Sequence, residues 1–442
     1  MSFETQLHTK TLDIHPQGLA IKGILSSALE AAEPEKAVHI YLKKEKGSLR
    51  IEEERYALKD IQNIYLIAFG KAAPAMASAT CKILGKLISG GIISSKYPST
   101  HNLNNLNNLE IHLAGHPVPD KRSLTAGEKI LKLLSKTTKK DLVLFMISGG
   151  GSALITAPVR GLSLSDLQNL TSLLLESGAR IDEINTLRRA LDRIKGGGLA
   201  KAAFPAQIAS LILSDVVDSP LEAIASGPTV PNPTTNADAL KILKKYNLLK
   251  KIPGSIIDIL NKKQDDLSKI STGKTLIIGS NRISAEAARD KAVQVGFKAQ
   301  ILTTSLQGEA AEKGKELARH LLALKEHPLC IIVGGETTVT LGNASGLGGR
   351  NQEMALSVVE EMSGSQDKIL ITLATDGDDG PTDAAGAVVN GETLKRAKLL
   401  GFNARAHLYE HNAYPFFDAL DDLLKPGPTG TNVNDLTFLF SF

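Results

Sequence analysis

Short runs of apolar residues recur along the chain, and each ends in glycine or serine. Four of them, at residues 64–70, 142–148, 208–214 and 275–279, consist mainly of Ile, Leu, Val, Phe and Ala. Continuous apolar runs of this length, bounded by turn residues, are typical of strands that are buried on both faces of a parallel sheet. The hydrophobic pattern therefore predicts four core strands in these places.

Segments with the period of a helix follow most of these runs. Residues 71–89, 163–178 and 283–295 are rich in Ala, Leu and Lys, so strands and helices alternate as they do in βαβ units. The predicted fold class is α/β with a Rossmann-like, mainly parallel sheet. The second half has its own alternation, with strands expected at 329–333, 338–341, 369–374 and 435–440 and helices at 351–363, 392–400 and 415–424.

The length indicates two domains, because 442 residues exceed the roughly 250–300 at which a single hydrophobic core stops growing. Residues 226–235 are rich in Pro and Gly, and residues before proline avoid helical backbone, so a boundary is expected soon after them, near 240–272. We predict an α/β domain at 1–245, a linker or hinge at 246–272, and a smaller α/β domain at 273–442. The Asn-rich run 101–108 between expected strands at 90–95 and 109–113 is predicted to be a surface loop.

Composition excludes several partners. The net charge is only +4, and with no Trp and 4% aromatic residues the stacking platforms of single-strand nucleic-acid binders are missing. No apolar run approaches the ~18 residues of a membrane span, and charged residues interrupt the first thirty positions. Cys81 and Cys330 lie far apart without a CxxC pattern, which favours buried thiols over a disulfide or a zinc site. We expect a cytoplasmic protein with neither nucleic acid nor membrane as partner.

One candidate for chemistry is the glycine-rich turn Ser148, Gly149, Gly150, Gly151 and Ser152, which follows the predicted strand 142–148. Bare glycines let backbone amides turn toward an anion, and the last serine could cap a helix. No GxGxxG or GxxxxGK[ST] pattern surrounds the turn. The residues by themselves are compatible with a phosphate cradle, but a glycine-rich turn alone favours a tight strand-to-helix turn.

Acidic residues crowd a second position. Asp376, Asp378, Asp379 and Asp383 follow the predicted strand 369–374, at the end of the strand where open α/β sheets bind ligands. Crowded carboxylates favour a cation, and Mg²⁺ bound with a nucleotide is one interpretation. The other is a network of Asx turns that shapes the loop.

Single polar residues at strand ends or beside a glycine-rich loop allow two interpretations each. Asp215 follows strand 208–214 and could be a base, a metal ligand or a helix cap. Lys71 follows strand 64–69 and could meet a phosphate at a helix start or lie exposed. Glu336 and Arg350 flank a glycine-rich loop, where the arginine could bind a carboxylate or phosphate or form a structural salt bridge.

Together these segments resemble the glycerate 2-kinase family that carries a carboxy-terminal MOFRL domain, and the resemblance runs from about residue 60 to 437. It rests on many short motifs, namely Phe69–Ala73, Gly115–Asp120, Ser148–Leu154, Ile194–Ala200, Leu213–Val216, Ser226–Thr229, Gly334–Val339, Gly348–Glu353, Thr375–Gly377, Gly380–Ala387 and Gly427–Leu436. Agreement by chance across so many motifs is negligible.

The resemblance implies two α/β domains with the active site in the cleft between them, Mg²⁺ and ATP as cofactors, and D-glycerate phosphorylated on its 2-hydroxyl. It also implies four active-site residues, for which we expect the following roles: Asp215 as base or orienter of the hydroxyl, Lys71 on the transferring phosphoryl, Arg350 on a carboxylate or the γ-phosphate, and Glu336 as orienter. Further binding residues expected within the motifs are Ser148, Gly149, Gly150, Gly151, Ser152, Lys195, Ser214 and Asn434, with Asp376, Asp379 and Asp383 on the metal.

Two stretches depart from the family pattern. Arg188, Arg189 and Ala190 stand where the family usually has Arg-Lys-His, and residues 411–414 replace an Asn-Asn-Asp-Ser-Tyr-like stretch, although Lys195 and Tyr414 remain. A hydroxypyruvate reductase is the alternative enzyme, but no GxGxxG follows any predicted strand. A non-catalytic sugar-acid binding protein is a third hypothesis. The acceptor could be the 2- or the 3-hydroxyl, and a homodimer is possible.

Overall fold

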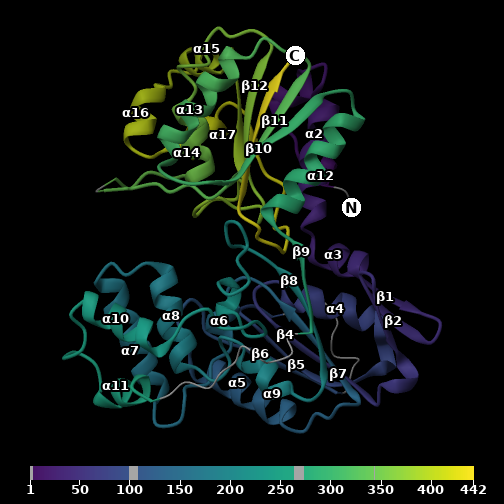
Figure 1. The fold of residues 1–442 in the computed structure, drawn as a ribbon. Coiled ribbons are helices and arrows are strands. Elements are labelled where there is room, and N and C mark those ends of the chain that lie inside the picture. The colour runs from purple at the N-terminus through teal and green to yellow at the C-terminus, as the bar shows by residue number, and fades with distance from the viewer. Residues whose placement is uncertain (1–2, 99–107, 263–272, 343) are drawn as a thin grey trace. The chain divides into compact units, whose positions relative to one another are not determined.

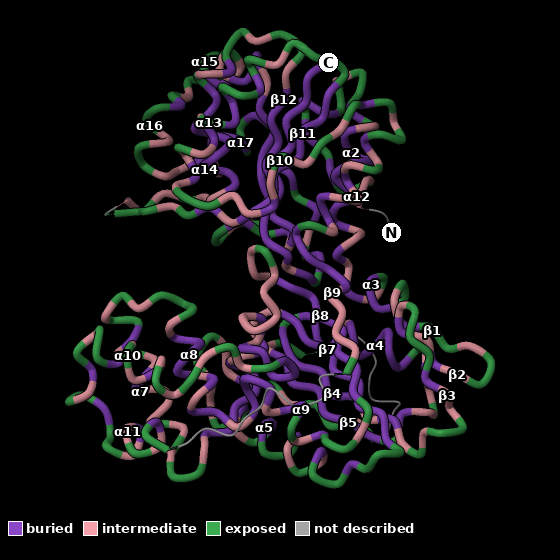
Figure 2. Tube along the Cα trace, viewed as in Figure 1, coloured by how far each residue is buried: buried purple, intermediate pink, exposed green. Residues whose placement is uncertain are grey.

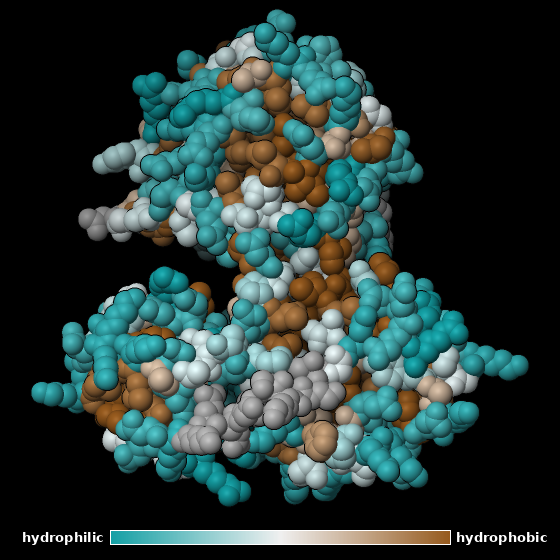
Figure 3. All heavy atoms as spheres, in the orientation of Figure 1, coloured by the Kyte–Doolittle hydropathy of each residue, from teal (hydrophilic) through white to brown (hydrophobic). Residues whose placement is uncertain are grey.

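The structure is a computed structural model that describes residues 3–98, 108–262, 273–342 and 344–442 (Figure 1). The chain divides into two compact units, one formed by residues 34–278 and the other by residues 1–33 together with 279–442. We call them the parallel-sheet unit and the mixed-sheet unit. The predicted α/β class with two domains is confirmed. Hydrophilic side chains cover most of the face of each unit that is drawn in Figure 3.

The parallel-sheet unit is built on a six-stranded sheet whose order is β6 (Leu109–Leu113), β5 (Ile88–Ser95), β4 (Asn63–Phe69), β7 (Asp141–Ile147), β8 (Gln207–Leu213) and β9 (Lys274–Gly279). Strands β6, β5, β4, β7 and β8 pair in parallel. The chain first runs outward from β4 to β6, and then returns to β7 on the other side of β4. The adjacent strands β4 and β7 are thus the point where the strand order reverses.

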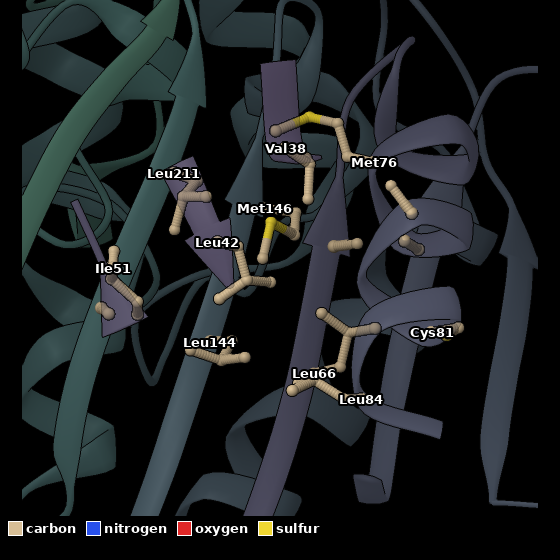
Figure 4. Close-up of a cluster of buried hydrophobic side chains, with 14 of the residues drawn as sticks. Val38, Leu42, Ile51, Leu66, Met76, Cys81, Leu84, Leu144, Met146 and Leu211 are labelled. Carbon is tan, nitrogen blue, oxygen red and sulfur yellow. The ribbon is translucent and has the colours of Figure 1, made fainter. Parts of the chain in front are cut away.

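Both faces of this sheet are covered. One face packs against α3 (Pro34–Tyr41), α4 (Ala73–Leu84) and a small antiparallel sheet of β1 (Leu42–Glu45), β2 (Ser48–Ile51) and β3 (Glu54–Ala57). Leu66, Leu144 and Leu211 point into this core (Figure 4). The neighbouring residues Phe145 and Ile212 point to the opposite face, which α5 (Lys121–Leu134) and α9 (Gly198–Ala203) cover. This alternation explains why β4, β7 and β8 read as continuous apolar runs, and Figure 2 shows them buried almost throughout.

A helical cluster completes the parallel-sheet unit. It contains α7 (Leu164–Glu176), α8 (Ile181–Leu191), α10 (Asn236–Lys245) and α11 (Gly254–Leu260), which share one apolar core, while the short helix α6 (Gly151–Leu154) follows β7. The predicted linker at 246–272 therefore begins inside this cluster rather than after it, because Leu248, Ile256 and Leu260 are buried there. The rest of that linker from residue 263 onward, and most of the Asn-rich run 101–108, lie outside the described residues.

The mixed-sheet unit has the strand order β10 (Lys298–Leu306), β11 (Leu329–Gly335), β15 (Asp435–Ser441), β12 (Lys368–Ala374), β13 (Gly386–Asn390) and β14 (Leu423–Leu424). Only β10 and β11 pair in parallel, and β15 runs antiparallel to both of its neighbours. The register places Asp435 opposite Gly335 on one side and Ala374 on the other. The first residue of the central strand is therefore surrounded by the loops that follow β11 and β12.

Helices cover both faces of the mixed sheet (Figure 1). One face packs on α13 (Ala310–Ala323), α14 (Arg350–Ser357), α15 (Thr393–Leu399), α16 (Ala404–Tyr409) and α17 (Ala413–Asp418), and the other on α2 (Gly18–Ala31) and α12 (Asn281–Gln294). The predicted strand at 338–341 is wrong. Thr338 makes only an isolated bridge to Glu309, and its amide donates to the Gly308 carbonyl at 2.9 Å. Likewise the helix expected at 415–424 ends at Asp418, and Leu423 and Leu424 form a strand.

The first 33 residues belong to the mixed-sheet unit, whereas we had expected them in the domain 1–245. Besides the apolar contacts of α2, a polar contact holds α1 (Lys10–Ile14) in place. The fully buried Asp422 carboxylate accepts hydrogen bonds from the Thr11 amide and hydroxyl, both at 2.9 Å, and from the Arg396 guanidinium at 2.7 Å. Burial raises the pKa of Asp422, while Arg396 and Thr11 oppose that shift.

No helix of the described residues is both long enough and apolar enough to cross a lipid bilayer. Cys81 and Cys330 are free thiols and both are buried, as predicted.

We predict that Arg396→Leu destabilises the mixed-sheet unit by about 3 kcal/mol, because it leaves the buried Asp422 carboxylate without its cation. Amide hydrogen exchange should rise in α1 and α2, the segments that Asp422 helps to hold. The matched control is Arg405→Leu, since the Arg405 pair with Glu360 is exposed and such pairs contribute little. Equal exchange in the two variants would show that the contact does not hold the segment.

Candidate functional site

The carboxyl ends of β4 and β7 form the first candidate site. In open α/β sheets a crevice opens where two adjacent strands send their connections to opposite sides, and ligands bind there. Here β4 leads into Gly70 and Lys71, and β7 leads into the glycine-rich turn of residues 148–151. Two predicted site segments that are far apart in sequence therefore meet at the switch point of the sheet.

Hydrogen bonds hold these two turns together. The Lys71 amide donates to the Gly149 carbonyl at 2.9 Å, and the Ala72 amide donates to the Ser148 hydroxyl at 3.0 Å. Gly70 has a φ of 128°, and a Cβ there would lie 2.1 Å from the Ser148 hydroxyl oxygen, so only glycine fits. The backbone of Lys71 is thereby fixed while its side chain is exposed.

Three polar side chains surround the glycine turn. A Cβ on Gly149 would lie 2.0 Å from Asp215 Oδ2, so the Asp215 carboxylate packs directly on that residue. A Cβ on Gly150 would lie 2.9 Å from His116 Nε2 and 3.4 Å from Lys71 Cγ. Gly150 also has a φ of 78°, which side chains other than hydrogen rarely allow. The turn is bare because Asp215, His116 and Lys71 occupy the space around it.

Several predicted binding residues are hydrogen-bonded within this turn or to the backbone and side chains around it. Ser148 and Ser214 are 2% and 1% exposed, and the Ser214 hydroxyl exchanges hydrogen bonds with the backbone of Val216. The Gly151 amide closes the turn on the Ser148 carbonyl at 3.2 Å. The Ser152 hydroxyl lies 2.9 Å from the Ser226 hydroxyl. These serines therefore shape the turn, and α6 after it is too short to act as an anion-binding helix.

Lys195 is the clearest difference from the sequence-based expectation. Its side chain is 3% exposed and its ammonium donates to the carbonyls of Ser152 and Ile155 at 2.9 and 3.1 Å. The same nitrogen lies 3.2 Å from Asp192 Oδ2. An ammonium has three protons and all three point at protein oxygens. Burial lowers the pKa of Lys195, and Asp192 opposes that shift. The bonds to Ser152 and Ile155 tie the Lys195 ammonium to α6 and to the residue after it.

The first departure from the family pattern lies next to Lys195. Arg188 lines a small closed cavity of about 30 Å³ together with Lys195 and Asp192, and burial lowers its pKa. The Arg189 guanidinium donates to the Glu222 carbonyl at 3.1 Å and to Thr186 Oγ1 at 3.2 Å. Both arginines therefore act inside the helical cluster.

The second candidate site is an open cavity of about 600 Å³ in the mixed-sheet unit. Its charged lining is mostly acidic and comprises Glu336, Arg350, Glu353, Asp376, Asp378 and Asp379. These residues come from the loops after β11 and β12 and from the start of α14, which converge around the first residue of β15.

Arg350 is held by two carboxylates. Its Nε and one terminal nitrogen donate to Asp435 at 2.6 and 3.3 Å, and its other terminal nitrogen donates to Glu336 at 2.9 Å. Burial alone would lower the pKa of Arg350, but the bonds to Asp435 and the charge of Glu336 outweigh it and raise the pKa. The structural salt bridge considered for Arg350 is thus present, and its second partner Asp435 was not among the predicted site residues.

Asp379 caps α14. Its carboxylate accepts hydrogen bonds from the Asn351 amide at 3.1 Å and the Gln352 amide at 2.9 Å, and it is 3% exposed. Burial raises the pKa of Asp379 to about 7. Asp383 points elsewhere, because it accepts a hydrogen bond from the Tyr414 hydroxyl at 2.6 Å and lies 3.4 Å from Lys425. Asp379 and Asp383, two of the expected metal ligands, thus both carry hydrogen-bond donors of the protein on their carboxylates.

Asp376 and Asp378 line the same cavity, and the Asp376 carboxylate accepts a hydrogen bond from the Asn432 side-chain amide at 3.2 Å. Burial raises the pKa of Asp376 to about 6, and the nearby Asp435 adds to this shift, so a cation here would relieve a cost of burial. No group of three or more His, Cys, Asp or Glu side chains among the described residues is arranged to hold a metal. Mg²⁺, however, commonly takes one or two carboxylates and completes its shell with substrate phosphates and water.

The remaining predicted residues shape the cavity. Asn434 is buried with a φ of 67°, and its carbonyl accepts hydrogen bonds from the Thr375 amide and hydroxyl at 3.2 and 2.6 Å. It therefore joins the approach to β15 to the end of β12. In the second departure from the family pattern, His411 Nδ1 lies 2.9 Å from Glu353 Oε1 at the cavity wall.

We predict that Lys195→Met lowers the stability of the parallel-sheet unit by about 2–3 kcal/mol, because two carbonyls and a buried carboxylate lose their donor. Thermal unfolding measures the loss. Lys241→Met is the matched control, since Lys241 forms an exposed pair with Asp238. A stable Lys195→Met variant that binds ligand poorly would restore the direct binding role.

Two family models match the chain: the domain of unknown function DUF4147 matches residues 20–261, and the MOFRL family matches residues 329–435. The chain is 39% identical to the D-glycerate 2-kinase of Thermotoga maritima over 95% of its length and 96% of that protein. It is 40% identical to the glycerate 2-kinase of Pyrococcus horikoshii over 96% and 97% of the two chains. The crystal structure of the Thermotoga maritima glycerate kinase matches with a TM-score of 0.87 at 38% identity, covering 97% of this chain and all of that one.

Sequence identity and fold thus agree over nearly the whole length of these kinases, and the chain belongs to the glycerate kinase family with a carboxy-terminal MOFRL domain.

Proposed function

We propose that this protein is an ATP-dependent kinase that phosphorylates D-glycerate on its 2-hydroxyl, with Mg²⁺ as the metal. The observation that supports it most is the arrangement at the switch point of the parallel sheet. There Lys71 and Asp215 lie on either side of a side-chain-free glycine turn. A cation and a carboxylate separated by a bare turn are the groups that transfer of a phosphoryl to a hydroxyl requires.

In the proposed reaction, an oxygen of glycerate forms a bond to the γ-phosphorus of ATP, and the bond from that phosphorus to the β-γ bridging oxygen breaks. The Asp215 carboxylate accepts the proton of the attacking hydroxyl, and ADP leaves. Lys71 stabilises the negative charge on the transferring phosphoryl, which is spread over its oxygens in the loose transition state. Each step thus uses a side chain that the sheet edge holds in place.

The mixed-sheet unit is proposed to contribute Arg350 and the metal. A guanidinium has five N–H donors, and the bonds to Asp435 and Glu336 use three of them. The other two donors suit a carboxylate or phosphate oxygen. When bound, Mg²⁺ would neutralise charge on the phosphates. Asp376 and Asp378 are the residues that we propose would hold it, with Asp379 and Asp383 as structural neighbours.

The test of this function is incubation of the protein with Mg²⁺, ATP and D-glycerate, followed by ³¹P NMR of the product. We expect 2-phosphoglycerate and ADP from the wild type, and Lys71→Ala should lower kcat/KM by at least ~100-fold. Lys44→Ala, an exposed lysine on β1, is the control. A folded Lys71→Ala variant of normal activity would remove Lys71 from the mechanism. Consumption of NADH with hydroxypyruvate, without ADP release, would support the reductase instead.

The metal assignment separates Asp376 from Asp383. Asp376→Asn should weaken binding of Mn²⁺, added in place of Mg²⁺ with ADP, by at least ~10-fold in an electron paramagnetic resonance titration. Asp383→Asn should bind Mn²⁺ as the wild type does, because Asp383 pairs with Tyr414 and Lys425. The opposite result for the two variants would return the metal to Asp383.

A further inference from the structure

Five neighbouring strands of the parallel sheet each place a polar or glycine-rich segment at the same edge. In sheet order these are His116 after β6, Lys96 after β5, Lys71 after β4, the glycine turn after β7 and Asp215 after β8. Adjacent strands lie about 4.8 Å apart, so the three basic residues follow strands that span about 10 Å of the edge. This order along the edge was not expected from the sequence.

The charges on this edge are separated. Lys96, Lys71 and His116 all lie on the β6 side of the glycine turn, and the Asp215 carboxylate lies on the β8 side. Asp120, which lies beside Gly115 on the β6 side, is already occupied as the N-cap of α5 and pairs with Arg122. The β6 side of the turn is therefore basic, because its carboxylate is used elsewhere.

His116 is packed against the turn itself. Its Nε2 lies within 2.9 Å of where a Gly150 Cβ would be, beside the stem of Lys71. Burial lowers the pKa of His116, and the charges of Lys71 and Lys96 add to the shift, which favours the neutral form of the ring. A neutral imidazole keeps one N–H donor. The ring thus offers a hydrogen bond beside the stem of Lys71, while the ammonium of Lys96, which follows the neighbouring strand β5, lies 4.8 Å from the centre of the Tyr97 ring.

His112, only four residues earlier, has different surroundings. It lies on β6 with its Nε2 3.2 Å from Glu110 Oε1, and Glu110 also pairs with Lys129. This histidine belongs to an ion-pair cluster on the strand and not to the turn. It is therefore a matched control for the position of His116.

We propose that Lys71, Lys96 and His116 form an anion-binding subsite on the β6 side of the glycine turn, and that its ligand is a phosphate. Two point-like ammonium groups and one imidazole donor suit the three oxygens of a tetrahedral phosphate, whereas a planar carboxylate is matched by the fork of an arginine. In the reaction proposed above, on which this part of the inference rests, the subsite holds nucleotide phosphate while Asp215 faces the acceptor hydroxyl.

The test is isothermal titration of the full chain with inorganic phosphate, with ADP and with D-glycerate. His116→Leu and Lys96→Gln should each weaken phosphate and ADP binding about tenfold, the effect of one lost hydrogen bond or ion pair to a charged group, and leave glycerate binding unchanged. His116→Gln should recover part of the affinity, since its amide restores a donor. His112→Leu should bind all three ligands as the wild type does. Thermal unfolding confirms that each variant is folded.

The outcomes separate this inference from the proposed function. If the chain fails to phosphorylate glycerate but His116→Leu loses phosphate affinity, the subsite stands and the kinase function falls. If the kinase is active and the two variants bind phosphate and ADP normally, the subsite is wrong. Weakened glycerate binding alone, or no binding of phosphate and ADP to the wild type, also overturns it.

Discussion

Burial of the parallel sheet on both faces is the constraint that organises this protein. Successive residues of β4, β7 and β8 point into two different apolar cores, so no side chain within these strands is available to a ligand. Only the residues that leave the strands can do chemistry, and parallel pairing brings their carboxyl ends to one edge. The glycines at this edge follow from the same constraint, because functional side chains from neighbouring strands occupy the space beside Gly70, Gly149 and Gly150.

The acidic cavity of the mixed-sheet unit depends on a different balance. Asp435 and Asp379 are buried carboxylates, and each is tolerated because cationic or amide donors satisfy its oxygens. The Asp376 carboxylate accepts a hydrogen bond from the Asn432 side-chain amide, but burial still raises its pKa to about 6. A carboxyl whose pKa is raised in the folded state lowers the free energy of unfolding at pH values above its ordinary pKa. A bound cation would offset this cost. The same residues would then affect both the stability of the unit and its affinity for the cation.

Sequence reasoning predicted the core strands well, because a strand buried on two faces leaves an uninterrupted apolar run. It also predicted the residues at strand ends, such as Lys71 and Asp215. It was less successful where a residue type has two uses. Lys195 and Asp379 look like ligand-binding groups, but tertiary contacts turn one into a support of α6 and the other into a cap of α14. Their partners are backbone groups, which no side-chain pattern reveals.

His116 and Asp435 were missed for a related reason. His116 follows the edge strand β6, whose partly exposed residues form a weaker hydrophobic pattern than those of a core strand. Its place near the glycine turn depends on the strand order β6, β5, β4, β7. Asp435 is the first residue of β15, and only the register opposite Gly335 and Ala374 brings it to Arg350. Strand order and register depend on contacts between residues that are far apart in the chain. Local patterns in a single sequence therefore do not predict them.

The discontinuous course of the mixed-sheet unit has a consequence for synthesis on the ribosome. Residues 34–278 are one continuous segment and can fold as soon as they have emerged, whereas α1 and α2 precede all of them. Thr11 meets Asp422 across a separation of 411 residues, and β15, the strand between β11 and β12, comes after every other strand of its sheet. At a translation rate of about 5–20 residues per second, the apolar face of α2 waits on the order of tens of seconds for its core. This early helix therefore keeps its apolar face exposed until the last strand of its sheet has been made.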